Sequence, residues 1–333
     1  MIHHYKSLLL ATALVYTNTV VANNDTSQTL QEKQTFILEM SQKHGFDQQS
    51  LAKTLDQAKV KQSILDAISR PAEKTLTWSQ YRNIFIKPKR IEGGVKFWKE
   101  NEADLNKAHQ QYGVPPEIIT AIIGVETLYG KHTGGYRVLD ALTTLGFHYP
   151  PRSKFFRKEL SQFLLLTREE QVDPTEPTGS YAGAMGKPQF IPSSYRHYAI
   201  DFDNDGKRDI WNNNTDVIGS VASYFNRHGW RRDQPVTVPA SNVDNNHDQM
   251  VKAGMKPSIS IERMREAGIG IDEQIRPGQL SSLVELKLTD GKEFWAGLHN
   301  FYVITRYNHS NMYAMAVYQL SQEILKARKE TEI

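Results

Sequence analysis

The 333-residue sequence contains no cysteine. This absence excludes a disulfide framework, thiolate metal ligands, iron–sulfur clusters, a cysteine nucleophile and a lipid attached to cysteine. The sequence also lacks an excess of one charge, because its formal net charge at pH 7 is only +3. So small a charge argues against nucleic acid or an anionic membrane surface as a partner. No apolar run in the sequence is long enough to span a bilayer.

The remaining composition is typical of a soluble globular protein. Apolar residues make up 39% of the chain, aromatic residues 10% and charged residues 23%. These fractions exclude a disordered chain, because a disordered chain is poor in aromatic and aliphatic residues. The length is sufficient for about two domains with a substantial core.

The N-terminus has the pattern of a secretory signal peptide. Lys6 precedes a short apolar stretch over residues 7–16, and Val20 and Ala22 occupy the −3 and −1 positions of a small-residue cleavage site. The apolar stretch is too short for a membrane anchor. We therefore expect residues 1–22 to be removed, which leaves a soluble, exported chain that begins at residue 23.

The order of patterns along the chain predicts a mainly α protein of the α+β class with a small β-rich insertion. Helical spacing is found over residues 28–70, 95–112, 115–130, 258–267 and 311–329. Short runs of the β type occupy residues 236–238, 282–288, 294–295 and 301–305, separated by polar turns. The β-type runs lie in the C-terminal third, so we expect one small β-rich domain there.

A single glutamate interrupts an otherwise apolar helix over residues 115–130. Glu126 is the only carboxylate in the interior of this helix, and its i−4, i−3 and i+3 neighbours are Ile122, Ile123 and Tyr129. Desolvation at such a position raises the pKa of a carboxyl group, and a protonated carboxyl group can act as a general acid. Alternatively, Glu126 pairs with an arginine or lysine, or it reaches solvent at a gap in the packing.

An acidic loop follows at residues 201–212. Asp201, Asp203 and Asp205 occupy positions 1, 3 and 5 of an EF-hand-like loop, a glycine occupies position 6, and Lys207 supplies a backbone carbonyl at position 7. Position 12 is Asn212 rather than the usual bidentate glutamate. The loop therefore predicts either a structural calcium site or an Asp/Asn-rich turn without metal. A regulatory sensor is disfavoured because sensor EF-hands usually occur in pairs.

Several motifs occur together and in one order. They are residues 124–130 (GVETLYG), 139–142 (LDAL), 155–160 (FFRKEL), 179–186 (GSYAGAMG), 189–195 (QFIPSSY), 201–206 (DFDNDG) and 304–310 (ITRYNHS). From about Trp78 to Lys326, the sequence resembles the membrane-bound lytic murein transglycosylase B family of Gram-negative bacteria. The resemblance implies a lysozyme-like core joined to an N-terminal α region.

The resemblance also implies an activity. Members of the family cleave the β-1,4 bond between N-acetylmuramic acid and N-acetylglucosamine in peptidoglycan without water, and they leave a 1,6-anhydromuramoyl end. By its motif, Glu126 corresponds to the sole catalytic residue. It first protonates the glycosidic oxygen and then acts as base toward the C6 hydroxyl group. Assistance from the N-acetyl group of the substrate replaces a second carboxylate. No cofactor takes part in this chemistry.

The motifs further imply residues that bind the substrate and the metal. Ser180 corresponds to a residue near the acid, and Arg152 to one of two basic residues that meet the stem peptide; the other is replaced by Pro151. The expected cleft residues are Gln189, Phe190, Tyr224, Tyr307, Asn308, Tyr313 and Tyr81. The family closes its calcium loop with a later aspartate, here Asp216, one residue further on than expected. We therefore expect a structural Ca²⁺ on Asp201, Asp203, Asp205, Lys207 and Asp216.

These patterns define the expected organisation and leave alternative functions open. The expected segments are a signal peptide (1–22), an N-terminal α region (23–94), a catalytic core (95–231) with the calcium loop (201–216), a small β-rich domain (232–306) and a closing segment with the C-terminal helix (307–333). The alternatives are a hydrolytic muramidase, a noncatalytic peptidoglycan-binding protein and a calcium-binding structural protein. Family members are often anchored by a lipidated cysteine, which this chain lacks. We therefore expect a soluble periplasmic protein without a membrane anchor. Its expected partners are glycan strands and proteins of cell-wall synthesis or turnover.

Overall fold

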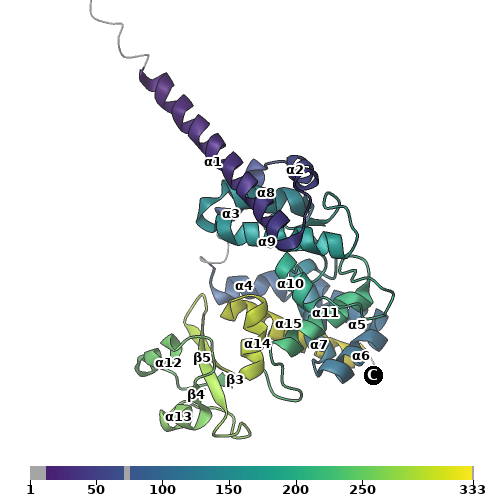
Figure 1. Cartoon of the computed structure of the whole chain (residues 1–333). Coiled ribbons are helices and arrows are strands. Elements are labelled where there is room, and N and C mark those ends of the chain that lie inside the picture. The colour runs from purple at the N-terminus through teal and green to yellow at the C-terminus, as the bar shows by residue number, and fades with distance from the viewer. Residues whose placement is uncertain (1–12, 71–75, 332–333) are drawn as a thin grey trace, which may run out of the picture. The chain divides into compact units, whose positions relative to one another are not determined.

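The computed structural model describes residues 13–70 and 76–331, and for residues 13–26 it describes only the backbone. The predicted signal peptide therefore lies largely outside the described residues, and its cleavage stays a prediction. No helix in the described part of the chain combines the length and the apolar character that a membrane span requires. The described chain is mostly helical, as expected, and divides into two compact units (Figure 1). Each unit is described by itself.

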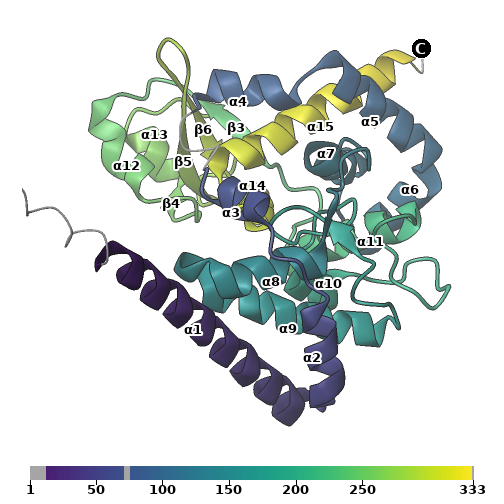
Figure 2. The same cartoon turned by 90° about the horizontal axis from the view of Figure 1, so that it is seen from above.

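The first unit is built from helices that are far apart in sequence. It contains α1 (Ala13–His44), α2 (Gln48–Asp56), α3 (Gln62–Ile68), β1 (Tyr136–Arg137), α8 (Val138–His148), η2 (Pro150–Arg152) and α9 (Ser153–Glu169). Helices α8 and α9 pack against each other, and α1 lies beside α8 (Figure 2). Phe36 of α1 meets Phe147 of α8 edge to face, with ring centroids 5.9 Å apart. The helical spacing predicted over residues 28–70 is confirmed, because its regularly spaced apolar side chains are buried on α1, α2 and α3: Phe36, Met40, Leu51, Leu55 and Ile64.

A buried ion pair fixes the start of α8 in this unit. Asp140 accepts hydrogen bonds from Nη2 and Nε of Arg137, at 2.6 and 3.0 Å, and from the backbone N–H of Lys59 at 2.8 Å. Its carboxylate is almost fully buried, and such a group requires partners of this kind. The contact ties the loop between α2 and α3 to α8.

The second unit surrounds the apolar helix α7 (Pro116–Thr127). Among its other helices are α4 (Trp78–Phe85), α5 (Pro88–Glu100), α6 (Glu102–Tyr112), α10 (Pro192–Tyr198), α11 (Asn214–Arg227), α14 (His299–Tyr307) and α15 (Asn311–Thr331). Helix α7 contacts α5, α6, α11 and α15, and Figure 2 shows it between α5, α15 and α11. Every residue from Ile118 to Val125 is buried, so this helix forms the centre of the unit's core.

The single helix predicted over residues 95–112 is wrong. Two helices occupy this region, and the helical conformation is interrupted between them at Asn101, where φ is −122° and ψ is 28°. The Asn101 side chain donates to the carbonyl of Phe97 at 2.7 Å and accepts from Asn214 at 3.0 Å. Asparagine side chains compete in this way with the hydrogen bonds of a continuous helix.

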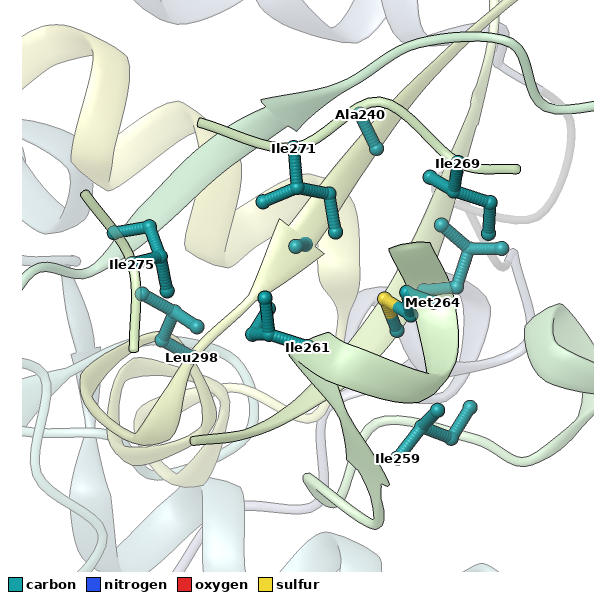
Figure 3. Close-up of a cluster of buried hydrophobic side chains, with 10 residues drawn as sticks. Ala240, Ile259, Ile261, Met264, Ile269, Ile271, Ile275 and Leu298 are labelled. Carbon is teal, nitrogen blue, oxygen red and sulfur yellow. The ribbon is translucent and has the colours of Figure 1, made fainter. Parts of the chain in front are cut away.

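The C-terminal third contains the expected small sheet. Its strands are β3 (Thr237–Ala240), β4 (Ile259–Ser260), β5 (Leu280–Lys287) and β6 (Lys292–Gly297), all antiparallel in the order β3-β6-β5-β4. The helices η3 (Asn245–His247), α12 (Asp248–Lys252) and α13 (Ile261–Glu266) accompany it. A cluster of buried aliphatic side chains, centred on Ile261, Met264 and Leu298, forms its core (Figure 3).

The predicted strand at residues 301–305 is also wrong, because this segment lies in helix α14. Phe301, Val303, Ile304 and Thr305 are all buried, so the segment is apolar on nearly every side. A short run of this kind has no periodicity that separates a strand from a buried helix. Asn300 favours the helix, because its amide group donates to the carbonyls of Arg231 and Gln234 at 2.8 and 2.9 Å.

Candidate active site

Glu126 lies in the last turn of α7, where the buried helix reaches the surface of the core. Its side chain is partly exposed, whereas the preceding residues are buried. The hydroxyl of Tyr313, in the first turn of α15, donates to Oε1 of Glu126 at 2.5 Å. Helices α7 and α15 are in contact, so the packing of two core helices brings the carboxyl group and the phenol together.

A second tyrosine lies behind this pair. The ring of Tyr307 is nearly parallel to that of Tyr313, with centroids 6.4 Å apart, and its hydroxyl donates to the carbonyl of Pro188 at 2.6 Å. Burial raises the pKa of both phenols well above the ordinary tyrosine value, and the nearby charge of Glu126 raises it further. Both hydroxyl groups therefore remain protonated at neutral pH and serve as donors.

The aromatic group continues away from Glu126. Phe190 packs against Tyr224 and Tyr307 at centroid distances of 5.7 and 5.9 Å. The Tyr224 hydroxyl donates to the carbonyl of Arg306 at 2.5 Å, which connects α11 to α14. Together with the Tyr307–Tyr313 contact, these contacts join four of the predicted cleft residues into one packed aromatic group, which we call the tyrosine cluster: Phe190, Tyr224, Tyr307 and Tyr313.

The chain over residues 179–190 supplies the remaining polar groups. Ser180 Oγ accepts the backbone N–H of Ala184 at 3.0 Å. Gln189 adopts a left-handed backbone conformation with φ of 52°, and its amide group donates to the carbonyls of Gly186 and Thr133 at 2.9 and 3.1 Å. The local backbone therefore fixes the position of the Gln189 side chain.

The other predicted residues have different surroundings. Tyr81, on α4, is buried beside Phe85 and is one of the smaller causes of the raised pKa of Tyr313. Asn308 ends α14 in an extended conformation, and its carbonyl accepts the N–H of Ser310. Arg152 belongs to the first unit, where its guanidinium group lies over the ring of Phe155 at 4.4 Å.

The structure corrects one neighbour of Glu126 and adds another aromatic residue. Helix α7 ends at Thr127 instead of near Gly130, so Tyr129 is not an i+3 neighbour on the same helical face. Sequence reasoning missed His228, whose ring stacks on Tyr224 at 4.1 Å. The i, i+4 spacing of these two residues was the available signal.

The acidic loop brings three carboxylates together. Ligand oxygens of Asp201, Asp203 and Asp205 lie within 4.8 Å of one another. Backbone N–H groups of the same loop bind the Asp201 carboxylate at 2.8 to 3.1 Å. Asp216 is fully buried and accepts the N–H groups of Phe202 and Asp209 at 2.7 and 2.8 Å. Converging carboxylate oxygens suit a hard cation such as Ca²⁺.

Comparison with known proteins gives consistent matches. A family model described as a transglycosylase SLT domain matches residues 28–322. The membrane-bound lytic murein transglycosylase B of Escherichia coli (strain K12) is 46% identical over 304 residues, which are 89% of this chain and 83% of that protein.

Two solved structures extend these matches. The soluble lytic transglycosylase SltB1 from Pseudomonas aeruginosa matches with a TM-score of 0.85 and 53% identity, covering 89% of this chain and 99% of that one. The Escherichia coli lytic transglycosylase Slt35 in complex with calcium matches with a TM-score of 0.80 and 46% identity, covering 89% and 93%. These likenesses confirm the expected mainly helical, lysozyme-like fold.

Proposed function

The chain belongs to the transglycosylase SLT domain family, whose members are lytic murein transglycosylases acting on peptidoglycan. From this membership and the geometry of the site, we propose that Glu126 is its single catalytic acid and base. The bond cleaved is the β-1,4 bond between N-acetylmuramic acid and N-acetylglucosamine. The product is a 1,6-anhydromuramoyl end, formed when the C6 hydroxyl of the same sugar replaces water as the nucleophile.

The observation that carries this proposal is the hydrogen bond between Glu126 and Tyr313. A phenol that stays protonated can donate to the carboxylate after Glu126 has given its proton to the glycosidic oxygen. Glu126 then takes the proton of the C6 hydroxyl and returns to its starting state. The N-acetyl group of the substrate stabilises the sugar carbon between the two steps, so a second carboxylate is not required.

Glu117, the other carboxylate of helix α7, does not serve as a second catalytic carboxylate beside Glu126. Glu117 lies in the first turn of the helix, nine residues before Glu126. At about 1.5 Å of rise per residue, the two backbones are about 14 Å apart. Glycosidases that use two carboxylates hold them closer, at roughly 5 to 10 Å. This separation argues against Glu117 as a second catalytic carboxylate.

We propose that the glycan strand binds along the tyrosine cluster, with Ser180, Gln189, Asn308 and Tyr81 as further contacts. In the first unit, we propose Arg152 as a contact for the stem peptide. The aromatic rings offer faces for the sugar C–H groups, and the fixed Gln189 amide offers hydrogen bonds. A more distant structure supports this substrate class: SltB3 from Pseudomonas aeruginosa, 27% identical with a TM-score of 0.78 over 88% of this chain and 79% of that one, was solved in complex with NAG-NAM-pentapeptide.

We also propose that the acidic loop binds a structural Ca²⁺ through Asp201, Asp203, Asp205, the Lys207 carbonyl and Asp216. The converging oxygens and the calcium complex of the relative Slt35 support this assignment. The ion would stabilise the loop and would take no part in the reaction. The N-terminal pattern and the peptidoglycan substrate together support a periplasmic location after signal-peptide cleavage. Proteins of cell-wall synthesis or turnover are the partners expected there.

Replacement of the acid tests the function. Glu126→Gln keeps the shape of the side chain but cannot transfer a proton, so we expect its release of soluble muropeptides from purified sacculi to fall at least about 1,000-fold, near the level without general acid catalysis. Glu117→Gln, on the same helix, is the matched control and is expected to keep the wild-type rate. Lysis by Glu126→Gln at the wild-type rate would overturn the assignment.

A further inference from the structure

The turn that directly follows Glu126 has an uncommon backbone. Leu128, Tyr129 and Gly130 adopt left-handed conformations in succession, with φ of 51°, 59° and 88°. A helix often ends on one left-handed glycine, but residues with a Cβ atom are disfavoured there. Two such residues in a row therefore require surrounding contacts that hold them in place.

The ring of Tyr129 supplies the first set of contacts. A Cβ atom added to Gly93, Gly94 or Gly124 would lie 2.9, 2.6 and 2.6 Å from atoms of the Tyr129 side chain. The phenol therefore occupies a slot that exists only because α5 and α7 carry glycine at these three positions. Its hydroxyl donates to the carbonyl of Arg90 at 2.7 Å, and its ring stacks on Phe97 with centroids 5.6 Å apart. We call this arrangement the Tyr129 slot.

The residue between Glu126 and the turn is held as well. Thr127 Oγ1 donates to the carbonyl of Lys187 at 2.9 Å and accepts the N–H of Gly130 at 3.0 Å. The N–H groups of Leu128 and Tyr129 donate back to the carbonyls of Gly124 and Ile123. The last turn of α7, which carries Glu126, is thus fixed on both sides.

The Tyr129 slot also contacts the helix that carries the hydrogen-bond donor of Glu126. A Cβ atom at Gly94 would lie 2.5 Å from Cδ1 of Ile324, in α15. Tyr313 lies eleven residues earlier on the same helix, about 16 Å along its axis. Helix α15 is therefore in contact with α7 through Tyr313 and with the Tyr129 slot through Ile324. A movement of the Tyr129 side chain out of the slot is expected to change the spacing of α7 and α15.

We propose that Tyr129, seated between Gly93, Gly94 and Gly124, is a positioning residue for the reaction: it holds the left-handed turn that sets the carboxyl group of Glu126 against Tyr313. This inference rests on the proposed role of Glu126. Tyr129 itself takes no part in proton transfer, because its hydroxyl is engaged with the Arg90 carbonyl on the side of α5.

Kinetics on soluble oligomers of the repeating disaccharide test the proposal. Gly124→Ala places a methyl group 2.6 Å from the Tyr129 hydroxyl, so we expect kcat to fall by about 10- to 100-fold with KM within about twofold, as for a misplaced catalytic group. The pH–rate profile is expected to shift, because the pair of Glu126 and Tyr313 is altered. Gly278→Ala, which adds a methyl group in open space, is the matched control and leaves both readouts unchanged.

A double-mutant cycle separates positioning from general stability. Tyr129→Ala removes the phenol, so adding Gly124→Ala to it is expected to cause no further loss of kcat. A Gly124→Ala variant that melts at a lower temperature but keeps the wild-type kcat and pH profile at temperatures where it is folded would overturn the proposal.

If Gly124→Ala does not fold, Tyr129→Phe tests the hydrogen bond of the Tyr129 hydroxyl to the Arg90 carbonyl. An unchanged kcat for Tyr129→Phe would contradict the positioning role of Tyr129. Loss of activity in Glu126→Gln together with wild-type kcat in Gly124→Ala removes only the positioning role, whereas an active Glu126→Gln removes the proposed function itself.

Discussion

At the scale of single residues, the proposed active site rests on one carboxyl group and one phenol. The 2.5 Å contact from Tyr313 to Glu126 is short for a neutral donor, as hydrogen bonds to charged acceptors are. Burial keeps the phenol protonated, so it can stabilise the carboxylate without competing for the proton that Glu126 moves in the proposed reaction. A hydrogen bond of this kind contributes about 1.5–3 kcal/mol.

Tyr313→Phe removes this donor and leaves the ring in place. We expect the rate of muropeptide release from sacculi to fall by about 10- to 100-fold, because about 1.4 kcal/mol corresponds to a factor of ten. Tyr318→Phe, on the same helix but beside Trp295 of the small sheet, serves as control and should retain the wild-type rate. A Tyr313→Phe enzyme as fast as the wild type would show that the hydrogen bond is not used.

The sequence predicts which residue is the candidate acid better than it predicts the local geometry around that residue. The apolar surroundings of Glu126 and the motif around it single it out as the candidate. The direction of Tyr129 was not predictable from its i+3 spacing, because the left-handed turn depends on Gly93 and Gly94, more than thirty positions earlier in the chain. The local sequence pattern does not reveal contacts between residues that lie so far apart in the sequence.

At the scale of elements, the acidic loop holds three carboxylates within 4.8 Å of one another. Like charges at this separation repel, and a bound divalent cation removes the repulsion. The backbone N–H groups bound by Asp216 hold the loop in its curved form from the inside. The loop is therefore expected to be stable without the ion but more stable with it.

Calcium removal and return test this view by thermal unfolding. For protein stripped with a chelator, we expect Tm to rise with added Ca²⁺. The expected gain is about 2.7 kcal/mol at a free calcium concentration one hundred times Kd. Asp203→Asn is expected to weaken the response, since it removes one carboxylate ligand, while Asp233→Asn outside the loop leaves it unchanged. A stripped protein whose Tm and calorimetric titration show no response to Ca²⁺ would contradict a metal site.

Some element boundaries follow the predicted ranges, whereas others depend on contacts that periodicity does not reveal. The C-terminal helix was expected over residues 311–329 and runs from Asn311 to Thr331. The segment 301–305 was mistaken for a strand, because its burial on nearly all sides removes the pattern on which such a distinction depends. The break at Asn101 depends on its hydrogen bond to Asn214, a contact that no local pattern contains.

At the scale of the whole molecule, buried tyrosines join the helices of the second unit. Burial raises the pKa of Tyr129, Tyr224, Tyr307 and Tyr313 above the ordinary value of 10.0. In the unfolded chain these phenols lose their protons near pH 10, whereas in the folded protein they retain them. Above that pH the folded state therefore binds more protons than the unfolded state.

The sign of the linkage follows from this difference. The contribution of the protonated buried tyrosines to the free energy of unfolding is fully present below pH 10. It declines as the pH rises from there toward the raised pKa values of these tyrosines in the folded state. We expect the free energy of unfolding to fall steeply above about pH 10, and tyrosinate absorbance from these residues to appear together with unfolding. Titration of all tyrosines near pH 10 while circular dichroism remains native would contradict the burial of the cluster.

The division of the chain into two units was not available from composition. The first unit combines the N-terminal helices with residues 136–177, which are inserted between segments of the second. Both parts are ordinary amphipathic helices, and only their packing, such as that of Phe36 on Phe147, reveals that they belong together. The order of motifs nevertheless predicts segments that the structure brings together around Glu126, such as those that carry Tyr307 and Tyr313.

The most direct test of the central claim is the mass of the product formed in water enriched in heavy oxygen. Purified sacculi are digested by the wild-type protein and by Glu126→Gln, and the released muropeptides are analysed by mass spectrometry. For the wild type, we predict muramoyl ends that are lighter by one water than the product of hydrolysis and that contain no heavy oxygen. For Glu126→Gln, we predict essentially no released muropeptides. Muramoyl ends that carry one heavy oxygen would show hydrolysis by water and contradict the account.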